Sequence, residues 1–460
     1  MAHIPDRSDL LGASNSVLPR RVEALDVLRG IALLGMFLVH MVRTAADPVW
    51  LGDRLVAAGV HTLALGKFYP LFSLLFGIGF AIQMQRVEER GGSFVGFYLR
   101  RMGTLFLLAL GIWVFADHNS ILFQYAVLGA VLVPLRRIPA RTLLLLGLAG
   151  ILVSVAYSPL HVEWRRHMVT VRLEQKGELP SLERVASELQ REDTELQRHN
   201  PNANGLTDHG TYWETALGRA EWLAYRVRTA GFYDNGEIFA MVVFGSVLGR
   251  AGVFRQIESR SPFIRQAMIW GLALGLPGSM LVFLGARWWD QTVLANHLLV
   301  SLLKHVSNPA LMLFYASATL EGLRHPRWRR LVALAGWPGR MALTHFALHI
   351  LFIAYLSYGY GFGLGGQIPA TLCWAVGASG FALQIVISLW WLRAFHFGPL
   401  EWAWRSSTYL RLEPLRRQHL AGSISLAPPK KVGPSGGRAA DTDWEDTNAA
   451  QAASARPRAL

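Results

Sequence analysis

The sequence has a single cysteine, Cys373, in 460 residues. One thiol excludes an internal disulfide framework and a metal site built from cysteines. Charged residues are also scarce, because Asp, Glu, Lys and Arg make up only 17% of the chain, against about 25% in an ordinary soluble protein. Hydrophobic residues make up 52%, and they gather in long runs with few ionisable side chains. This composition excludes a disordered, collagen-like or coiled-coil chain and predicts a protein that crosses the membrane many times.

The apolar runs predict about ten membrane-spanning segments. They lie at 27–42, 68–84, 102–116, 120–135, 143–157, 236–254, 266–285, 293–320, 340–358 and 369–392. In hydrocarbon every backbone amide needs an internal hydrogen-bond partner, so runs of this length and number are expected to be helices. We therefore predict an all-α, polytopic membrane protein of about ten transmembrane helices with a small external cap. A further apolar stretch, 54–66, is broken by glycines and is interpreted as an interfacial helix or a re-entrant segment.

The net charge of +14 does not indicate nucleic-acid binding here, because the arginines lie between the apolar spans. With the N-terminus in the cytoplasm, the short inner connections carry fifteen arginines and the outer ones four lysines or arginines. Cytoplasmic loops collect Lys and Arg, so both termini are expected to be cytoplasmic.

Five segments follow from this pattern. Residues 1–24 are predicted to be a polar cytoplasmic segment, 25–157 a first bundle of about five helices and 158–235 an extracytoplasmic helical cap. Residues 236–412 are predicted to be a second bundle of about five helices. The segment 413–460 is rich in Ala, Pro, Gly and Ser, which is typical of a disordered cytoplasmic tail.

Arg29 and His40 are the first candidate functional residues. They are eleven residues apart in the first span, so both point to one helix face, about 16–17 Å apart along the axis. Ionisable groups within a span are costly and usually face a polar cavity. One interpretation is an acyltransferase in which Arg29 contacts the phosphates of cytosolic acyl-CoA and His40 is the catalytic base toward an acceptor hydroxyl or amine. The alternative is that Arg29 reaches the inner headgroups and His40 lies at the outer interface.

The ninth span offers His345 and His349, which share a helix face at spacing i, i+4. Two such histidines can bind zinc, but no adjacent Glu completes a His-Glu-x-x-His pattern and no thiolate is near, so we predict no metal site. They are instead candidates for lining a substrate cavity. The alternative is that both histidines only pack between helices. Arg340 enters the same helix after the break predicted at 336–339. It is a second candidate for phosphate contact, or one more arginine that reaches the headgroups.

Two further polar features lie at predicted outer ends of spans. Asp117 and His118 belong to a tight turn on the same side as His40 and are candidate substrate-binding residues, although short polar turns also occur without a function. Glu237 opens the sixth span, where a carboxylate offsets the helix dipole, and it is interpreted as structural.

Several stretches together resemble a known family. They are DVLRGIALLGMFLVH at 26–40, KFYPLFSLLFGIGFAIQ at 67–83, GRMALTHF at 339–346, YGYGFGLGGQ at 358–367 and RAFHFGPLEWAWRSSTY at 393–409. They look like domain-of-unknown-function family 418, the YeiB-like bacterial membrane proteins, over most of residues 20–412.

The first span of that family also resembles those of acyltransferase family 3 and of heparan-α-glucosaminide N-acetyltransferase, multi-span enzymes that move acyl groups from CoA to acceptors. Acyltransferase family 3 carries a basic residue, ten residues and then a histidine, and Arg29 and His40 match that spacing. Many YeiB-like proteins look to have Asn in place of His40, so this chain departs from their pattern. The resemblance implies acyl transfer in a bacterial plasma membrane, with acyl-CoA as co-substrate, a small hydroxyl or amine acceptor and no permanently bound cofactor.

Other functional classes use the same features. A transporter or exporter of a small metabolite would line its pathway with these polar residues, and broken helices in two symmetric halves would favour it. A membrane scaffold or sensor would use the tail.

Overall fold

The structure is a computed structural model that describes residues 20–89, 91–116, 121–201, 205–228, 235–253, 261–290 and 293–417. These residues are predominantly helical, and the β-type pairing among them is one isolated bridge between Phe395 and Arg416. The helices are α2 (Arg20–Arg43), α3 (Leu51–Leu63), α4 (Phe68–Glu88), α5 (Phe94–Phe115), α6 (Ile121–Leu135), α7 (Ala140–Gln175), α8 (Leu182–Arg198), α9 (Leu206–His209), α10 (Tyr212–Arg228), α11 (Gly236–Arg250), α12 (Ser261–Trp288), α13 (Leu294–Arg324), α14 (Pro326–Ala333), α15 (Gly336–Arg340), α16 (Ala342–Ser357), α17 (Ala370–Ala394) and α18 (Pro399–Tyr409). The predicted tail from residue 418 onward lies outside the described residues.

Seven helical segments of the described chain are long and apolar enough to cross a membrane. They are α2, the segment that contains α3 and α4, α5, α7, α12, α13 and α17. The apolar helices α6 and α16 are shorter, with 15 and 16 residues, and α11 has 15. Each of the ten predicted spans corresponds to one of these helices, so the prediction of an all-α polytopic membrane protein is confirmed. The stretch at 54–66 falls largely in helix α3.

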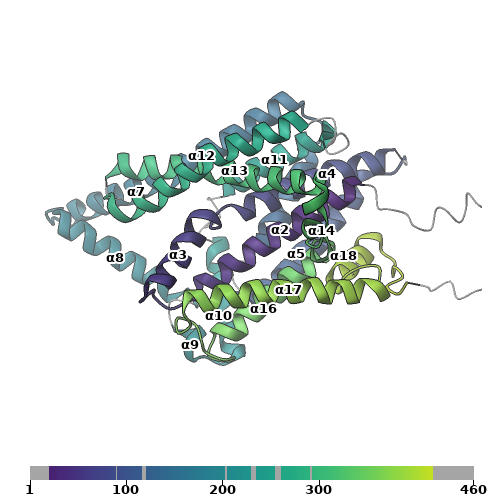
Figure 1. Ribbon diagram of the computed structural model, residues 1–460. Helices are drawn as coiled ribbons and strands as arrows, with labels where there is room; N and C mark the ends of the chain where they lie inside the picture. Colours follow the sequence, from purple (N-terminus) through teal and green to yellow (C-terminus); the bar gives the residue numbers. More distant parts are fainter. Residues whose placement is uncertain are drawn as a thin grey trace, which may run out of the picture. The chain divides into compact units, whose positions relative to one another are not determined.

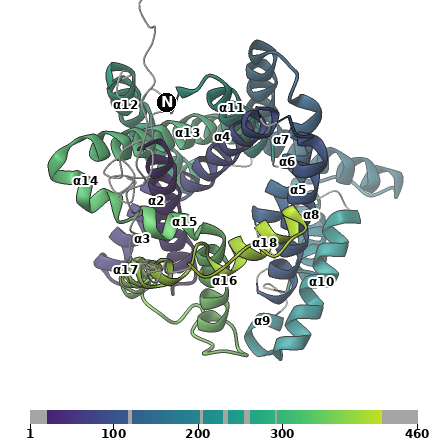
Figure 2. The same cartoon turned by 90° about the vertical axis from the view of Figure 1, so that its right-hand side faces the viewer.

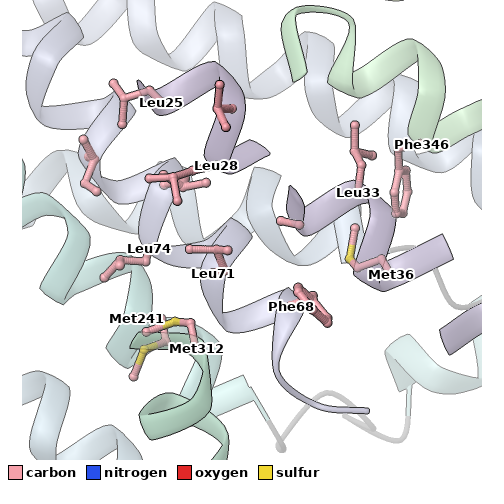
Figure 3. Packing of buried hydrophobic residues seen from close by; sticks show 14 of the residues in the cluster. Leu25, Leu28, Leu33, Met36, Phe68, Leu71, Leu74, Met241, Met312 and Phe346 are labelled. Carbon is pink, nitrogen blue, oxygen red and sulfur yellow. The ribbon is translucent and has the colours of Figure 1, made fainter. Parts of the chain in front are cut away.

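Helix α2 is the central helix of the bundle. It contacts α4 and α13 on one side and α16 and α17 on the other, as both views show (Figures 1 and 2). Its side chains are buried around most of its circumference, with Leu28 at 1% exposure and Leu33 at 0%, which is typical of a helix that is apolar on all faces. Leu33, Met36 and Phe346 lie together in the hydrophobic cluster between α2 and α16 (Figure 3).

Helices α4 and α11 pack with their backbones in close contact. A Cβ atom added to Gly77 of α4 would lie 1.9 Å from the carbonyl oxygen of Val242, and one added to Gly245 of α11 would lie 2.0 Å from that of Leu74. Small residues allow this approach, as the small-xxx-small spacing of Gly245 and Gly249 predicts. This pair holds α4 in a fixed position, and α4 carries much of the cavity described below.

The predicted cap region is helical where it is described. Helix α7 continues past the predicted end of its span to Gln175. Helix α8 is held against α7 by charge pairs, in which Arg172 donates to Glu192 at 2.6 Å and Arg165 donates to Asp193 at 2.8 Å.

Helix α10 contacts the end of α5 and the connection between α16 and α17. Tyr212 donates through its hydroxyl to the carbonyl of Phe115 at 3.0 Å. Arg219 of α10 is fully buried, and one of its Nη atoms lies 3.3 Å from the hydroxyl of Tyr360. These contacts join the segment after α7 to the helical bundle.

Candidate functional site

One cavity brings together residues that are far apart in the sequence. It has a volume of about 380 Å³ and is lined by residues of α2, α4, α5, α6, α15, α16 and α18. Four arginines line it, namely Arg29, Arg101, Arg340 and Arg405. Arg29 and Arg340 are the two arginines that the sequence nominated for phosphate contact, and the structure brings both to this cavity. Under the predicted topology α2, α5 and α16 enter the membrane from the cytoplasm near these arginines, so this end of the cavity is expected to be cytoplasmic.

Two of the arginines lie over aromatic rings. The guanidinium carbon of Arg101 is 3.6 Å from the ring centroid of Trp404, and that of Arg405 is 4.8 Å from the ring centroid of Phe397. A guanidinium group is attracted to the face of an aromatic ring. Its N–H donors at the edge stay available for acceptors such as phosphate oxygens.

Carboxylates neutralise only part of this positive charge. Arg29 donates to Asp26 at 2.9 Å, and Arg405 lies 3.8 Å from Glu413. Arg101 has no ion pair with a carboxylate in the described part of the chain. The arginine-lined end of the cavity therefore suits an anion with several negative charges.

The opposite wall of the cavity is largely apolar and follows one face of α4. The α4 residues that line it are Phe72, Leu75, Phe76, Gly79, Phe80 and Gln83. From Phe72 to Gln83 this face extends about 16 Å along the helix axis. The wall therefore leads from the arginines toward the opposite end of the cavity.

The far end of the cavity is formed by Met36 of α2 and by the start of α6. Tyr125 of α6 lines this end, and its hydroxyl donates to the carbonyl of Tyr69 at 3.1 Å. The hydroxyl of Ser73 lies 3.2 Å from the hydroxyl of Tyr125. Polar groups at this end are therefore already bonded to the protein.

The closing motif at 393–409 forms part of the arginine-lined end of the cavity. Glu401 of α18 accepts hydrogen bonds from the backbone N–H groups of Leu343 at 2.6 Å and Thr344 at 3.0 Å, and from the Thr344 hydroxyl at 2.5 Å. The carboxylate therefore caps the N-terminus of α16. Burial raises the pKa of Glu401, and these hydrogen bonds act in the opposite direction. Trp404 donates from its indole N–H to the carbonyl of Arg101 at 2.8 Å.

His40 lies on the α2 face that carries Arg29 and Met36, because the three residues follow the spacing i, i+7, i+11. The lining of the cavity on α2 ends at Met36, one turn before His40. On α16 the lining ends at Phe346, three residues before His349. His40 is partly exposed and is not among the described residues that line the cavity.

His345 and His349 are buried between α16 and α17, at 0% and 1% exposure. The Nε2 atom of His345 lies 2.7 Å from the Ser388 hydroxyl, and that of His349 lies 2.9 Å from the Oε1 atom of Gln384. Neither histidine is among the described residues that line the cavity. His349 also stacks on Phe37 of α2, with ring centroids 4.1 Å apart, and it interacts electrostatically with His40.

Two nominated residues, Asp117 and His118, lie outside the described residues. Within the described ranges, no group of three or more His, Cys, Asp or Glu side chains has an arrangement that could hold a metal ion.

Sequence reasoning did not nominate Arg101, Glu401, Trp404 or Arg405. A signal for Arg101 was present, since Tyr98, Arg101 and Leu105 follow helical spacing and all line the cavity. The other three belong to the closing motif at 393–409, which carries the resemblance but whose sequence alone assigns no role to these side chains.

Two segments of the chain match known families. Residues 248–411 match the family described as "Protein of unknown function (DUF418)". Residues 21–175 match the one described as "Heparan-alpha-glucosaminide N-acetyltransferase, catalytic". The cavity lies where the two segments meet. Residues 21–175 contribute Arg29 and Arg101, and residues 248–411 contribute Arg340 and Arg405.

Similar proteins over most of the length are uncharacterised. The chain is 25% identical over 422 residues to the uncharacterized protein YxaH of Bacillus subtilis, covering 86% of this chain and 96% of the relative. It is 27% identical over 405 residues to an uncharacterized 39.9 kDa protein of Bacillus acidopullulyticus, with the same coverage of 86% and 96%. It is 25% identical over 411 residues to the uncharacterized protein YeiB of Escherichia coli, covering 84% of this chain and 95% of the relative. No solved structure matches the chain significantly.

The predicted resemblance is therefore confirmed: residues 248–411 are similar to family 418, residues 21–175 are similar to the heparan-α-glucosaminide N-acetyltransferase catalytic domain, and the chain is similar over most of its length to the uncharacterized proteins YxaH and YeiB.

Proposed function

We propose that this protein is an integral-membrane acyltransferase that moves an acyl group, acetyl in the simplest case, from cytosolic acyl-CoA to a hydroxyl or amine acceptor. One observation carries the proposal. An arginine-lined, partly apolar cavity runs along the same face of α2 that carries His40 one turn further on. The similarity of residues 21–175 to a catalytic N-acetyltransferase domain supports acyl transfer as the reaction class.

The successive parts of acyl-CoA match successive parts of the cavity, from the arginine-lined end to Met36. The phosphates of CoA carry several negative charges, and Arg29, Arg101 and Arg340 offer guanidinium groups that bind phosphate oxygens in pairs. The pantetheine arm is extended and mostly neutral, which suits the apolar wall of α4. An arm that starts at the arginines and follows this wall brings its thioester toward Met36.

His40 would act as the general base. It takes the proton from the acceptor hydroxyl or amine as the acceptor attacks the thioester carbonyl, the C–S bond breaks, and the CoA thiolate leaves and takes up that proton. His40 is one turn, about 6 Å along the axis, beyond Met36. The side chains of Met36 and Phe346 must therefore move before the thioester reaches the imidazole, and an unbranched Met rearranges readily.

The roles of the other nominated residues stay proposals. His345 and His349, one turn apart on α16, would act by keeping the helix beside His40 in place, since their Nε2 atoms bond to α17. Asp117 and His118 would meet the acceptor from the outer side, under the proposed extracytoplasmic cap.

The test uses the purified full-length protein in lipid nanodiscs with acetyl-labelled acetyl-CoA and a panel of sugar, polyol and amine acceptors. We expect the wild type to transfer label to at least one acceptor class and His40→Ala to lose transfer while it still binds CoA. His325→Ala removes an exposed histidine at the start of α14 and should keep full activity. Absence of CoA binding by the wild type, together with equal background transfer by all variants, would contradict the proposal. Counterflow of a metabolite in vesicles without acyl-CoA would indicate a transporter instead.

A further inference from the structure

The short helix α14 connects α13 to α15, and α15 ends at Arg340, which lines the arginine-rich end of the cavity. Helix α14 packs against α2, α13 and α15, and Figure 2 shows it at the edge of the bundle. Helix α13 has 31 residues, or about 46 Å of helix, which exceeds the bilayer's hydrocarbon core of about 30 Å. The last turn of α13 and the helix α14 are therefore expected at the level of the lipid headgroups.

Two contacts fix the inner face of α14 against the bundle. Arg329 donates from a guanidinium N–H to the carboxylate of Glu23 on α2 at 3.4 Å. Val332 packs against the hydrophobic cluster around α2, and its side chain would lie 3.1 Å from a Cβ atom added to Gly322 of α13. These contacts determine which residues of α14 point away from the bundle.

The outer face of α14 carries large apolar side chains. Trp328 is 58% exposed, and Leu331, at spacing i, i+3 on the same face, is 61% exposed. Leu334, which follows the end of the helix, is also exposed. Leaving such side chains in water forgoes the free energy of burying them, whereas tryptophan is enriched where a membrane meets water. This apolar edge therefore suits the boundary between headgroups and acyl chains.

Two arginines, Arg327 and Arg330, are exposed beside this apolar edge and share one side of the helix at spacing i, i+3. Among the residues that the structure describes, neither of them forms an ion pair with a carboxylate. The neighbouring Arg324, at the end of α13, differs in this respect because Glu321 pairs with it at 3.0 Å. The outer face of α14 thus places two uncompensated positive charges next to an exposed indole.

We propose that the outer face of α14 binds an anionic phospholipid, with the headgroup phosphate on Arg327 and Arg330 and the acyl chains beside Trp328 and Leu331. Helices that combine a basic side with exposed Trp and Leu lie in the interface of anionic membranes, and guanidinium groups bind phosphate oxygens in pairs. The charge selects this occupant, because a purely apolar partner would leave both arginines uncompensated. Neither arginine lines the cavity, so this site does not depend on the proposed acyl transfer.

Native mass spectrometry of the full-length protein, titrated with phosphatidylglycerol or with phosphatidylcholine, tests the site. We expect the wild type to bind phosphatidylglycerol more tightly. The double variant Arg327→Gln/Arg330→Gln should lower that affinity about tenfold and leave the affinity for phosphatidylcholine unchanged. The matched control is Arg137→Gln/Arg141→Gln, which removes two exposed arginines from the connection between α6 and α7 and should keep the wild-type affinity.

Three outcomes would overturn the proposal. The first is equal affinity of the wild type for the two lipids. The second is an equal loss in both double variants, because the effect would then be the general attraction between basic loops and anionic lipids. The third is binding of inorganic phosphate that requires Arg327 and Arg330 while the protein shows no preference between lipids, which would indicate a soluble anion as the occupant.

A spin label locates the apolar edge while both arginines stay in place. The label is attached to Leu331→Cys in a Cys373→Ala background, in nanodiscs that contain phosphatidylglycerol. We expect this label to collide more often with oxygen, which dissolves in lipid, than with a water-soluble nickel complex. The control label on Arg191→Cys, at an exposed position of α8, should show the reverse. A Leu331→Cys label that behaves like the Arg191→Cys label would place α14 in water and contradict the proposal.

Discussion

The guanidinium group of Arg101 lies over the indole ring of Trp404, with 3.6 Å between its central carbon and the ring centroid. The contact joins the two segments that match different families, since Arg101 belongs to residues 21–175 and Trp404 to residues 248–411. The indole N–H also donates to the carbonyl of Arg101. The arginine-rich end of the cavity therefore forms only when both halves of the chain are present.

Replacing Arg101 should weaken CoA binding without unfolding the protein. Arg101→Met keeps an unbranched side chain over Trp404 but removes the charge, and a lost hydrogen bond to a charged group costs about 1.5–3 kcal/mol. We expect the Kd for CoA to rise about tenfold or more, as measured by equilibrium binding in nanodiscs. Arg393→Met, an exposed arginine at the end of α17, is the control and should leave the Kd unchanged. Equal Kd values for both variants would remove Arg101 from the site.

Opening the far end of the cavity should expose position 40 to reagents from the cytoplasmic side. The background is Cys373→Ala with His40→Cys, so that one thiol reports access. Adding Met36→Ala removes the α2 side chain at which the cavity lining ends, and we expect a several-fold faster reaction with a bulky charged thiol reagent. Leu33→Ala deletes a similar volume from the same hydrophobic cluster but not from the cavity lining, and it should leave the rate unchanged. Equal rates with Met36→Ala and Leu33→Ala would mean that the cavity does not lead to position 40.

The contact between α4 and α11 should not tolerate a larger side chain. Gly77→Val places a branched side chain where even a Cβ atom would lie 1.9 Å from a backbone carbonyl oxygen. Overpacking of this kind costs about 1–3 kcal/mol, occasionally more, and it should lower the melting temperature in detergent. Gly103→Ala on α5 is the control, because nothing lies within 4 Å of its added Cβ, and alanine there should stabilise the helix slightly. A Gly77→Val protein as stable as the wild type would contradict the close packing.

The attachment of α8 to α7 should depend on pH through Glu192. Partial burial raises the pKa of Glu192, but hydrogen bonds from Arg172 and Arg165 outweigh this effect, so the pKa lies below its ordinary value. A carboxyl group with a lowered pKa stabilises the fold above its ordinary pKa of about 4.3 and loses this contribution as the pH falls through its folded value.

Hydrogen exchange of α8 measures this dependence. We expect protection at neutral pH, loss of protection in acid, and little pH dependence in Glu192→Gln. The control Glu195→Gln removes a carboxylate that pairs with Arg198 on the same helix, and it should behave like the wild type. Protection in Glu192→Gln that follows the wild-type pH curve would exclude Glu192 as the cause.

The helices and part of the site could be predicted from the sequence, for identifiable reasons. Apolar runs specify membrane helices because the backbone must bond internally, so all ten predicted spans correspond to helices. The sequence indicates Arg29 because it shares a helix face with His40, and Arg340 because it enters the ninth span after the predicted break. The sequence does not distinguish Arg101 and Arg405 from other arginines near span ends, and only the packing of α5 against α18 does so. The outer face of α14 could not be predicted, because only the tertiary fold shows that Arg329 turns inward to Glu23.

The central claim is that the arginine-lined cavity binds acyl-CoA and that His40 acts on it from one turn away. The most direct measurement is the equilibrium binding of CoA to purified wild type, His40→Ala and an Arg29→Met/Arg101→Met double variant, combined with a single-turnover assay of acyl transfer. We predict that His40→Ala binds CoA like the wild type but transfers no acyl group, whereas the double variant loses binding. A wild-type protein that binds no CoA, or a His40→Ala protein that transfers the acyl group at the wild-type rate, would contradict the account.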